Sequence, residues 1–110
     1  MKSSKNILNL IPRHSKKVGW SQDLHQLVTL EVKNRGVANF IAQTLFKKPR
    51  VSYIHLEEFG SFIWLQIDGQ RDVRAIGERI KKRFGDSAQP IYSRLIQYIK
   101  TLKNNNFITV

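Results

Sequence analysis

The stretch Val51-Ser-Tyr-Ile-His-Leu-Glu-Glu-Phe-Gly-Ser-Phe-Ile-Trp-Leu-Gln-Ile-Asp-Gly69 changes from a strand pattern to a helix pattern within a few residues. Residues 51–56 are rich in β-branched and aromatic side chains, which favours a strand. Glu57 and Glu58 favour a helix start, because carboxylates are stabilised at the positive end of the helix dipole. Asp68 and Gly69 then break the helix. Its apolar face is predicted to comprise Phe59, Phe62, Ile63 and Ile67.

Two further helices are predicted after this turn. Asp72 is expected to cap the first, and Gly85 marks its end. Ser87 is expected to cap the second, with Pro90 in its first turn. The short connection between them gives the pair the proportions of a helix-turn-helix, and residues 107–110 are expected to pack back in extended form. The inward-facing positions are predicted to be Val73, Ile76, Ile80 and Phe84 in the first helix, and Ile91, Leu95, Ile99 and Leu102 in the second.

A β-hairpin is predicted upstream of the quoted stretch. Residues 17–22 and 27–33 show strand patterns and are joined by residues 23–26. Between this hairpin and the third strand, Val37 to Leu45 carries apolar residues at helical spacing. The predicted fold class is therefore α+β and winged helix-turn-helix-like. It has a three-stranded antiparallel sheet followed by three helices, with an extra helix before the third strand.

The composition is that of one small basic domain. The 110 residues suffice for a single core, and 19 basic against 8 acidic side chains give a net charge of +11. Such a charge favours an acidic partner, whether peptide, protein, nucleic acid or anionic lipid. We interpret residues 1–17, which carry five basic residues and no acid, as a mobile basic tail, and residues 18–110 as the domain. No apolar run is long enough for a membrane span, so we expect a cytoplasmic protein.

Catalytic and metal-binding patterns are absent from the sequence. There is no cysteine, and His14, His25 and His55 have no ligand-like spacing. No nucleophile–base order or Gly-rich phosphate loop is visible, and the adjacent Glu57 and Glu58 are better explained by the helix start. We therefore expect no enzyme activity, no cofactor and no metal.

Several short pieces of the chain have a distinctive order and spacing, although each piece is common alone. The pieces are Ile54-His-Leu-Glu-Glu-Phe-Gly-Ser-Phe-Ile-Trp64, Ile67-Asp-Gly69, Val73-Arg-Ala-Ile76, Phe84-Gly85 and Phe107-Ile108. Together they resemble the PqqD family, the coenzyme PQQ synthesis protein D type. The resemblance covers roughly Val51 to Val110.

The resemblance implies a non-catalytic adaptor, a recognition element for ribosomally made and modified peptides. Such a domain binds the leader segment of a precursor peptide and presents it to a radical SAM maturase, in PQQ-like or other modified-peptide biosynthesis. The leader would add as a further strand beside the third strand and the third helix, which is β-augmentation. Mapped onto this chain, the peptide-binding residues would be Val51, Ser52, Tyr53, Ile54 and His55 of the strand, and Tyr92, Ile96, Ile99 and Lys103 of the helix.

Two features of the chain leave alternatives open at this groove. Lys47, Lys48 and Arg50 either attract an acidic leader or maturase surface, or form an ordinary solvated face. The helix expected at Val37 to Leu45 can wall the groove, cover it or hold another partner. The peptide, its pathway and the maturase are not identified by the sequence.

Two other functions compete with the adaptor. A winged-helix DNA-binding protein would suit the net charge and the polar third helix, although the first turn of that helix, 88–91, is poor in base-reading donors. A scaffold whose basic tail binds a membrane or an acidic protein would need no open groove. The polar residues that would face DNA are Gln89, Ser93, Arg94 and Gln97.

Overall fold

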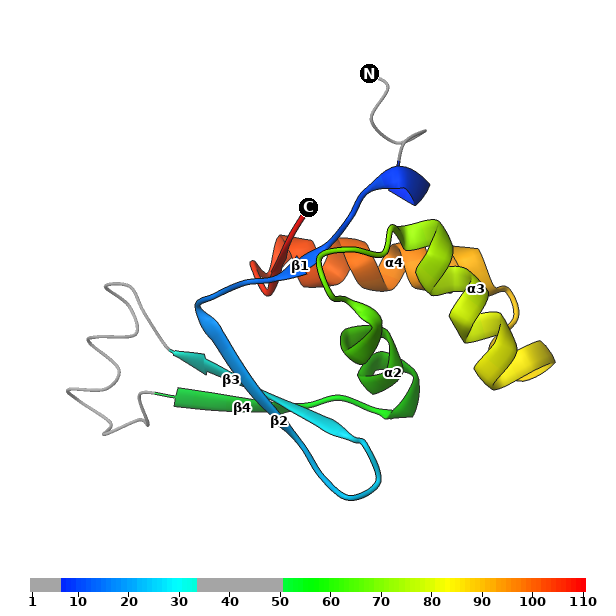
Figure 1. Ribbon diagram of the computed structural model, residues 1–110. Helices are drawn as coiled ribbons and strands as arrows, with labels where there is room; N and C mark the ends of the chain where they lie inside the picture. The colour runs from blue at the N-terminus through cyan, green and yellow to red at the C-terminus, as the bar shows by residue number, and fades with distance from the viewer. Residues whose placement is uncertain (1–6, 34–50) are drawn as a thin grey trace.

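The computed structural model describes residues 7–33 and 51–110, and it has the predicted α+β architecture (Figure 1). A three-stranded antiparallel sheet precedes three helices, so the predicted fold class is confirmed. The extra helix expected at Val37 to Leu45 lies outside the described residues. The elements are β1 Arg13–His14, β2 Val18–Gln22, β3 Val28–Lys33, β4 Val51–His55, α2 Glu58–Gln66, α3 Val73–Phe84, the 3-10 turn η2 Gly85–Ala88, α4 Ile91–Asn104 and β5 Ile108–Thr109.

The sheet has the order β2-β3-β4, so β3 is its central strand. Leu30 of β3 lies opposite Trp20 on one side and Ile54 on the other. Because side chains alternate between the two faces of a strand, these three residues share one face, and Leu30 is fully buried there. The opposite face carries Glu31 and Tyr53, which are exposed. The sheet therefore has one face on the core and one toward solvent.

Ser61, the buried polar residue of the core, joins the sheet to α2. Leu56 N–H donates to the Val28 carbonyl at 2.9 Å, which continues the β3–β4 ladder by one residue. The Val28 N–H donates to Ser61 Oγ at 2.8 Å, and this hydroxyl donates onward to the Leu56 carbonyl at 3.2 Å. The hydroxyl thus satisfies one donor and one acceptor that the ladder leaves unpaired.

Trp64 of α2 lies at the centre of the core and is fully buried. The His14 ring stacks on it at 3.9 Å between centroids and 5° between planes, and His14 Nε2 lies 2.9 Å from the Trp64 carbonyl oxygen. Burial lowers the pKa of His14, and the hydrogen bond to Trp64 opposes this in part. The apolar stripes predicted for α3 and α4 face the same core: Val73, Ile76, Ile80, Ile91, Leu95, Ile99 and Leu102 are buried, and Phe84 packs at the edge.

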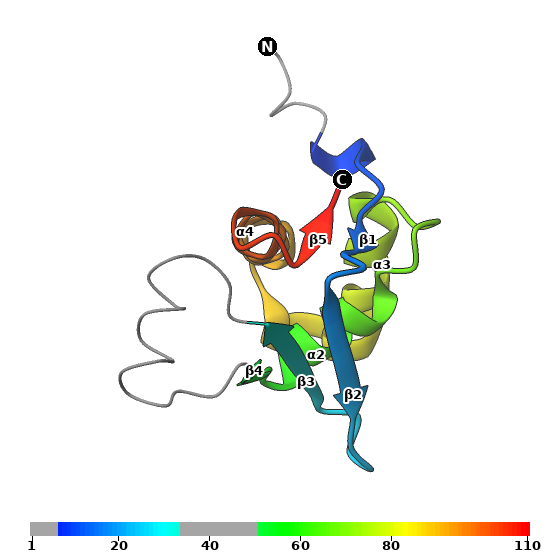
Figure 2. The ribbon, with the colours of Figure 1, turned by 90° about the vertical axis from the view of Figure 1, so that its left-hand side faces the viewer.

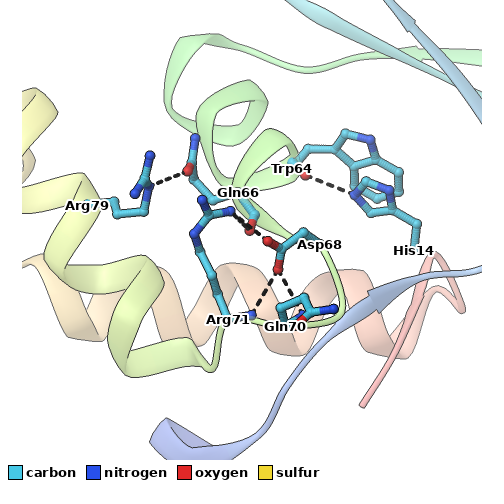
Figure 3. A network of polar contacts seen from close by, with 7 residues as sticks. All are labelled: His14, Trp64, Gln66, Asp68, Gln70, Arg71 and Arg79. Atoms are coloured by element: carbon cyan, nitrogen blue, oxygen red, sulfur yellow. Dashed lines mark hydrogen bonds and ion pairs between the residues drawn. The ribbon is translucent and has the colours of Figure 1, made fainter.

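Polar contacts fix the turn between α2 and α3 (Figure 3). The Asp68 carboxylate accepts the N–H groups of Gln70 and Arg71, and the Arg71 guanidinium at 2.9 Å. These bonds and the pairing with Arg71 lower the pKa of Asp68. Gly69 has φ of +76°, which glycine adopts without a steric penalty. The predicted break at residues 68 and 69 is therefore confirmed.

The structure differs from the expected mobile tail in residues 7–17, which pack against the domain. The Pro12 carbonyl accepts Gly69 N–H, and the Leu10 carbonyl accepts Val73 N–H. β1 pairs with β5, so the two ends of the domain lie side by side (Figure 2). The apolar residues of this segment outweigh its basic charge, because Ile7, Leu8 and Leu10 pack on the core and Pro12 is buried.

The turn between α3 and α4 also differs in detail from the prediction. Ser87 does not cap α4; it lies in η2 and donates to the Phe84 carbonyl. Pro90 stands at the N-cap of α4, after a cis peptide bond. The predicted cap at Asp72 and the end at Gly85 are confirmed, since Asp72 accepts Ala75 N–H and Gly85 has φ of +59°.

Ser61→Ala is expected to lower the free energy of unfolding by about 1–3 kcal/mol, because Val28 N–H and the Leu56 carbonyl would lose their buried partner. Urea denaturation followed by circular dichroism measures the change. Ser93→Ala is the matched control, since Ser93 is exposed on α4, and it is expected to stay within about 0.5 kcal/mol of wild type. Equal stabilities for the two variants would contradict the bridging role of the Ser61 hydroxyl.

Candidate functional site

The outer side of β4 is an edge of the sheet in the described part of the chain. β4 pairs with β3, and no strand of residues 7–33 or 51–110 pairs with its other side. In an antiparallel ladder, hydrogen-bonded and non-bonded pairs alternate. Since Leu56 bonds to Val28, the main-chain groups of Ser52 and Ile54 also face β3. Those of Val51, Tyr53 and His55 therefore face outward, and we call this side the β4 edge.

The side chains of β4 divide between the two faces of the sheet. Ile54 packs on the core, whereas Tyr53 is 62% exposed on the outer face. His55 Nδ1 lies 2.9 Å from Thr29 Oγ1 on the neighbouring strand, also on the outer face. The five strand residues predicted for the site, 51–55, thus form one continuous strand, as the sequence indicated.

The helix residues predicted for the site lie on the core stripe of α4 and on the flank that faces α3. Ile99 is buried in the core. Tyr92 faces α3, where it packs over Gly77 and its hydroxyl donates to the Glu78 carboxylate. Ile96 and Lys103 follow Tyr92 at helical spacing and so lie on the same flank of α4. Gly77 explains this placement, because a methyl group there would collide with the Tyr92 ring.

The opposite flank of α4, formed by Arg94 and Tyr98, reaches the segment that follows β4. Tyr98 donates to Glu57 Oε1 at 3.1 Å and meets the Phe59 ring at 6.2 Å between centroids. Gly60 makes room for it, since a methyl group there would collide with the Tyr98 hydroxyl. Figure 2 shows α4 and β4 on one side of the domain and α3 on the other. We call Arg94 and Tyr98 the α2-facing flank.

Both helix tyrosines are held in the protonated form. Burial raises the pKa of Tyr98 well above its usual range, and the Glu57 carboxylate adds to the effect. Burial also raises the pKa of Tyr92 to about 12, with Glu78 as a further cause. Both phenols can therefore donate hydrogen bonds at any physiological pH. The tyrosines of the two flanks have equivalent chemistry and differ in which glycine accommodates the ring.

Basic side chains lie on the outer face of the sheet next to the start of β4. A hollow of about 390 Å³ is lined by Lys16, Lys17, Gly19, Glu31, Lys33 and Val51. None of its lysines forms an ion pair in the described chain, so the hollow keeps a net positive charge. The predicted electrostatic residues Lys47, Lys48 and Arg50 lie outside the described residues. This hollow was not predicted from the sequence, because Lys16 and Lys17 belong to the segment that was expected to be a mobile tail.

A second hollow of about 400 Å³ lies between α2 and α3, away from the β4 edge. Its lining is basic, with an aromatic ring: Phe62, Glu78, Arg79, Lys82 and Arg83. Arg79 donates to Gln66 Oε1 at 2.6 Å, and Arg83 pairs with Glu58 at 3.0 Å. These partners hold the two guanidinium groups on the surface of the helices.

The described residues contain no group of three or more His, Asp or Glu side chains placed to hold a metal ion. The His14 ring is hydrogen-bonded to the Trp64 carbonyl, and the His55 ring is hydrogen-bonded to the Thr29 hydroxyl. No helix of residues 7–33 and 51–110 combines the length and apolar character that a membrane crossing requires.

The fold and the β4 edge define a small winged-helix-like α+β domain, in which α3, η2 and α4 form the helix-turn-helix. Residues 36–108 match the family described as Coenzyme PQQ synthesis protein D (PqqD). The chain therefore belongs to the PqqD family. Neither a curated protein nor a solved structure matches it.

In Tyr98→Phe, the free energy of unfolding is expected to fall less between about pH 9 and pH 11 than it does in wild type. A phenol whose pKa is raised in the folded state stabilises it fully below its ordinary pKa of about 10, and this contribution is lost as the pH rises through the raised value. Unfolding free energies from urea titrations at about pH 9 and pH 11 measure the slope. Glu57→Gln is expected to give an intermediate slope, because burial, the larger cause, remains. Equal slopes for wild type and Tyr98→Phe would contradict this account.

Proposed function

We propose that the protein is a non-catalytic adaptor that binds the leader of a ribosomally made precursor peptide. The leader would be presented to a radical SAM maturase in PQQ-type biosynthesis or a related peptide-modification pathway. Membership of the PqqD family supports the pathway. A precursor made on ribosomes also suits the expected cytoplasmic location. The β4 edge supports the mode of binding.

One observation carries the proposal: the main-chain groups of Val51, Tyr53 and His55 face away from β3. An extended peptide can bond to these groups and become a fourth strand, which supplies affinity without dependence on its sequence. Ser61 and the β3 ladder hold the strand in place, so little ordering of the protein is required on binding.

The positive charge of the protein supports an acidic peptide. The three lysines of the hollow at Val51 form no ion pair within residues 7–33 and 51–110, and they lie on the outer face of the sheet beside the edge. Opposite charge raises the association rate more than the affinity, and salt screens it. We therefore propose that the lysines guide the peptide and that main-chain pairing retains it.

The maturase requires a surface that the bound peptide leaves open. The hollow between α2 and α3 meets this requirement, since Phe62 and Arg79 lie on different elements from the β4 edge. We propose that the enzyme docks on this side, so that peptide and enzyme bind together.

Tyr53→Pro tests the proposal, because proline removes the outward N–H at the centre of the edge and leaves the bonds to β3 intact. Peptides selected from a random mRNA-displayed library on the full chain serve as probes, and fluorescence anisotropy measures their affinity. We expect the variant to bind at least about tenfold more weakly than Tyr53→Ala, which keeps the N–H.

Thermal unfolding should show that both Tyr53 variants remain folded. Ile54→Pro removes an N–H that faces β3 and is expected to destabilise the sheet itself. Selected peptides that bind Tyr53→Pro and Tyr53→Ala equally well would show that recognition does not use the β4 edge.

A further inference from the structure

Arg94 differs from the other arginines of the two long helices. Arg74 donates to Asn9, Arg79 to Gln66 and Arg83 to Glu58. Arg94 has no hydrogen-bond acceptor and no ion pair among residues 7–33 and 51–110. Within the described part of the chain, its N–H groups are therefore not taken by any acceptor.

The Arg94 side chain is nevertheless held in position. Its guanidinium carbon lies 4.2 Å from the centroid of the Phe59 ring, and that ring is nearly buried in the first turn of α2. A guanidinium stacked on an aromatic face keeps its planar edge of N–H groups free, and this edge matches the two oxygens of a carboxylate. Less conformational entropy is lost when such a prepositioned group binds.

Arg94 lies on the α2-facing flank of α4, next to the segment that follows β4. It stacks on Phe59, and one helical turn later Tyr98 bonds to Glu57. Glu57 follows the end of β4 by two residues, so Tyr98 bonds to the chain just beyond the His55 end of the strand. A strand added to β4 would present every second side chain toward this flank.

We propose that the peptide bound at the β4 edge carries an aspartate or glutamate whose carboxylate is bound by Arg94. This rests on the proposed function and adds a selectivity rule to it. The lysine hollow acts near Val51 at the other end of the strand, through point charges without fixed geometry. Arg94 supplies a directional contact at the His55 end, and it thereby sets the register of the peptide.

The experiment is a double-mutant cycle with peptides from the random library that lose affinity for Tyr53→Pro. Each acidic residue of such a peptide is changed to its amide, and each peptide is titrated against wild type and Arg94→Gln. One acid is expected to be coupled to Arg94: either change alone weakens binding about tenfold, and both together weaken it no further.

Control variants separate this contact from general charge. Lys100→Gln removes one positive charge from an exposed position on another face of α4 and is expected to change affinity less than about twofold. Arg94→Lys keeps the charge and the helix while losing the planar fork, so it is expected to weaken binding of the same peptides. It also replaces Arg94→Gln should that variant unfold.

Other outcomes of the experiment would show which of the two proposals is wrong. Peptides that need the Tyr53 N–H but bind Arg94→Gln and Arg94→Lys as tightly as Lys100→Gln would overturn the role of Arg94 and leave the adaptor function standing. Recovery of no peptide that depends on Tyr53 would overturn both. Tight binding of random duplex DNA at physiological salt, lost in Arg94→Gln and kept in Tyr53→Pro, would assign Arg94 to nucleic acid and overturn the proposal.

Discussion

The hydroxyl of Ser61 is the contact on which the arrangement of the rest depends. It completes the ladder between β3 and β4 at the point where the chain leaves the sheet, and it does so from inside α2. This fixes the alternation of main-chain groups along β4 and hence which of them face outward. It also fixes where α2 begins, so Phe59 and Gly60 stand where α4 can place Arg94 and Tyr98 against them. One buried polar contact therefore sets both components of the candidate site.

The main helices and the strands of the sheet could be predicted from the sequence, because their residue patterns are strong and local. β4 and α2 follow from the change of pattern between 51–56 and 57–67, and the caps at Asp72 and Gly85 follow from side-chain chemistry that acts within one turn. The packing of residues 7–17 was not predicted, because it depends on contacts with residues far away in the sequence. The segment's basic residues and lack of acids suggested a solvated tail, whereas its placement depends on distant partners such as Trp64 and Ile108.

The helix part of the site could not be predicted from the sequence, because both flanks of α4 carry a tyrosine beside a core stripe. Tyr92 and Tyr98 differ in whether Gly77 or Gly60 accommodates the ring. Both glycines lie within predicted helices, where nothing local distinguishes them. The strand part was predictable, since a third strand that leads into a helix and follows a hairpin belongs at an edge of the sheet.

The excess of positive charge protects the open β4 edge from pairing with a second copy of the chain. An unpaired strand edge is a template for a second copy of the same chain, and natural proteins protect such edges with charge. At a net charge of +11, and with lysines at the Val51 end of β4, two copies repel each other where their edges would meet. A strand of opposite charge meets no such barrier. On the proposed function, the charge that keeps the edge from pairing with itself would also select the kind of strand that pairs with it, and Arg94 at the far end would add geometry to that selection.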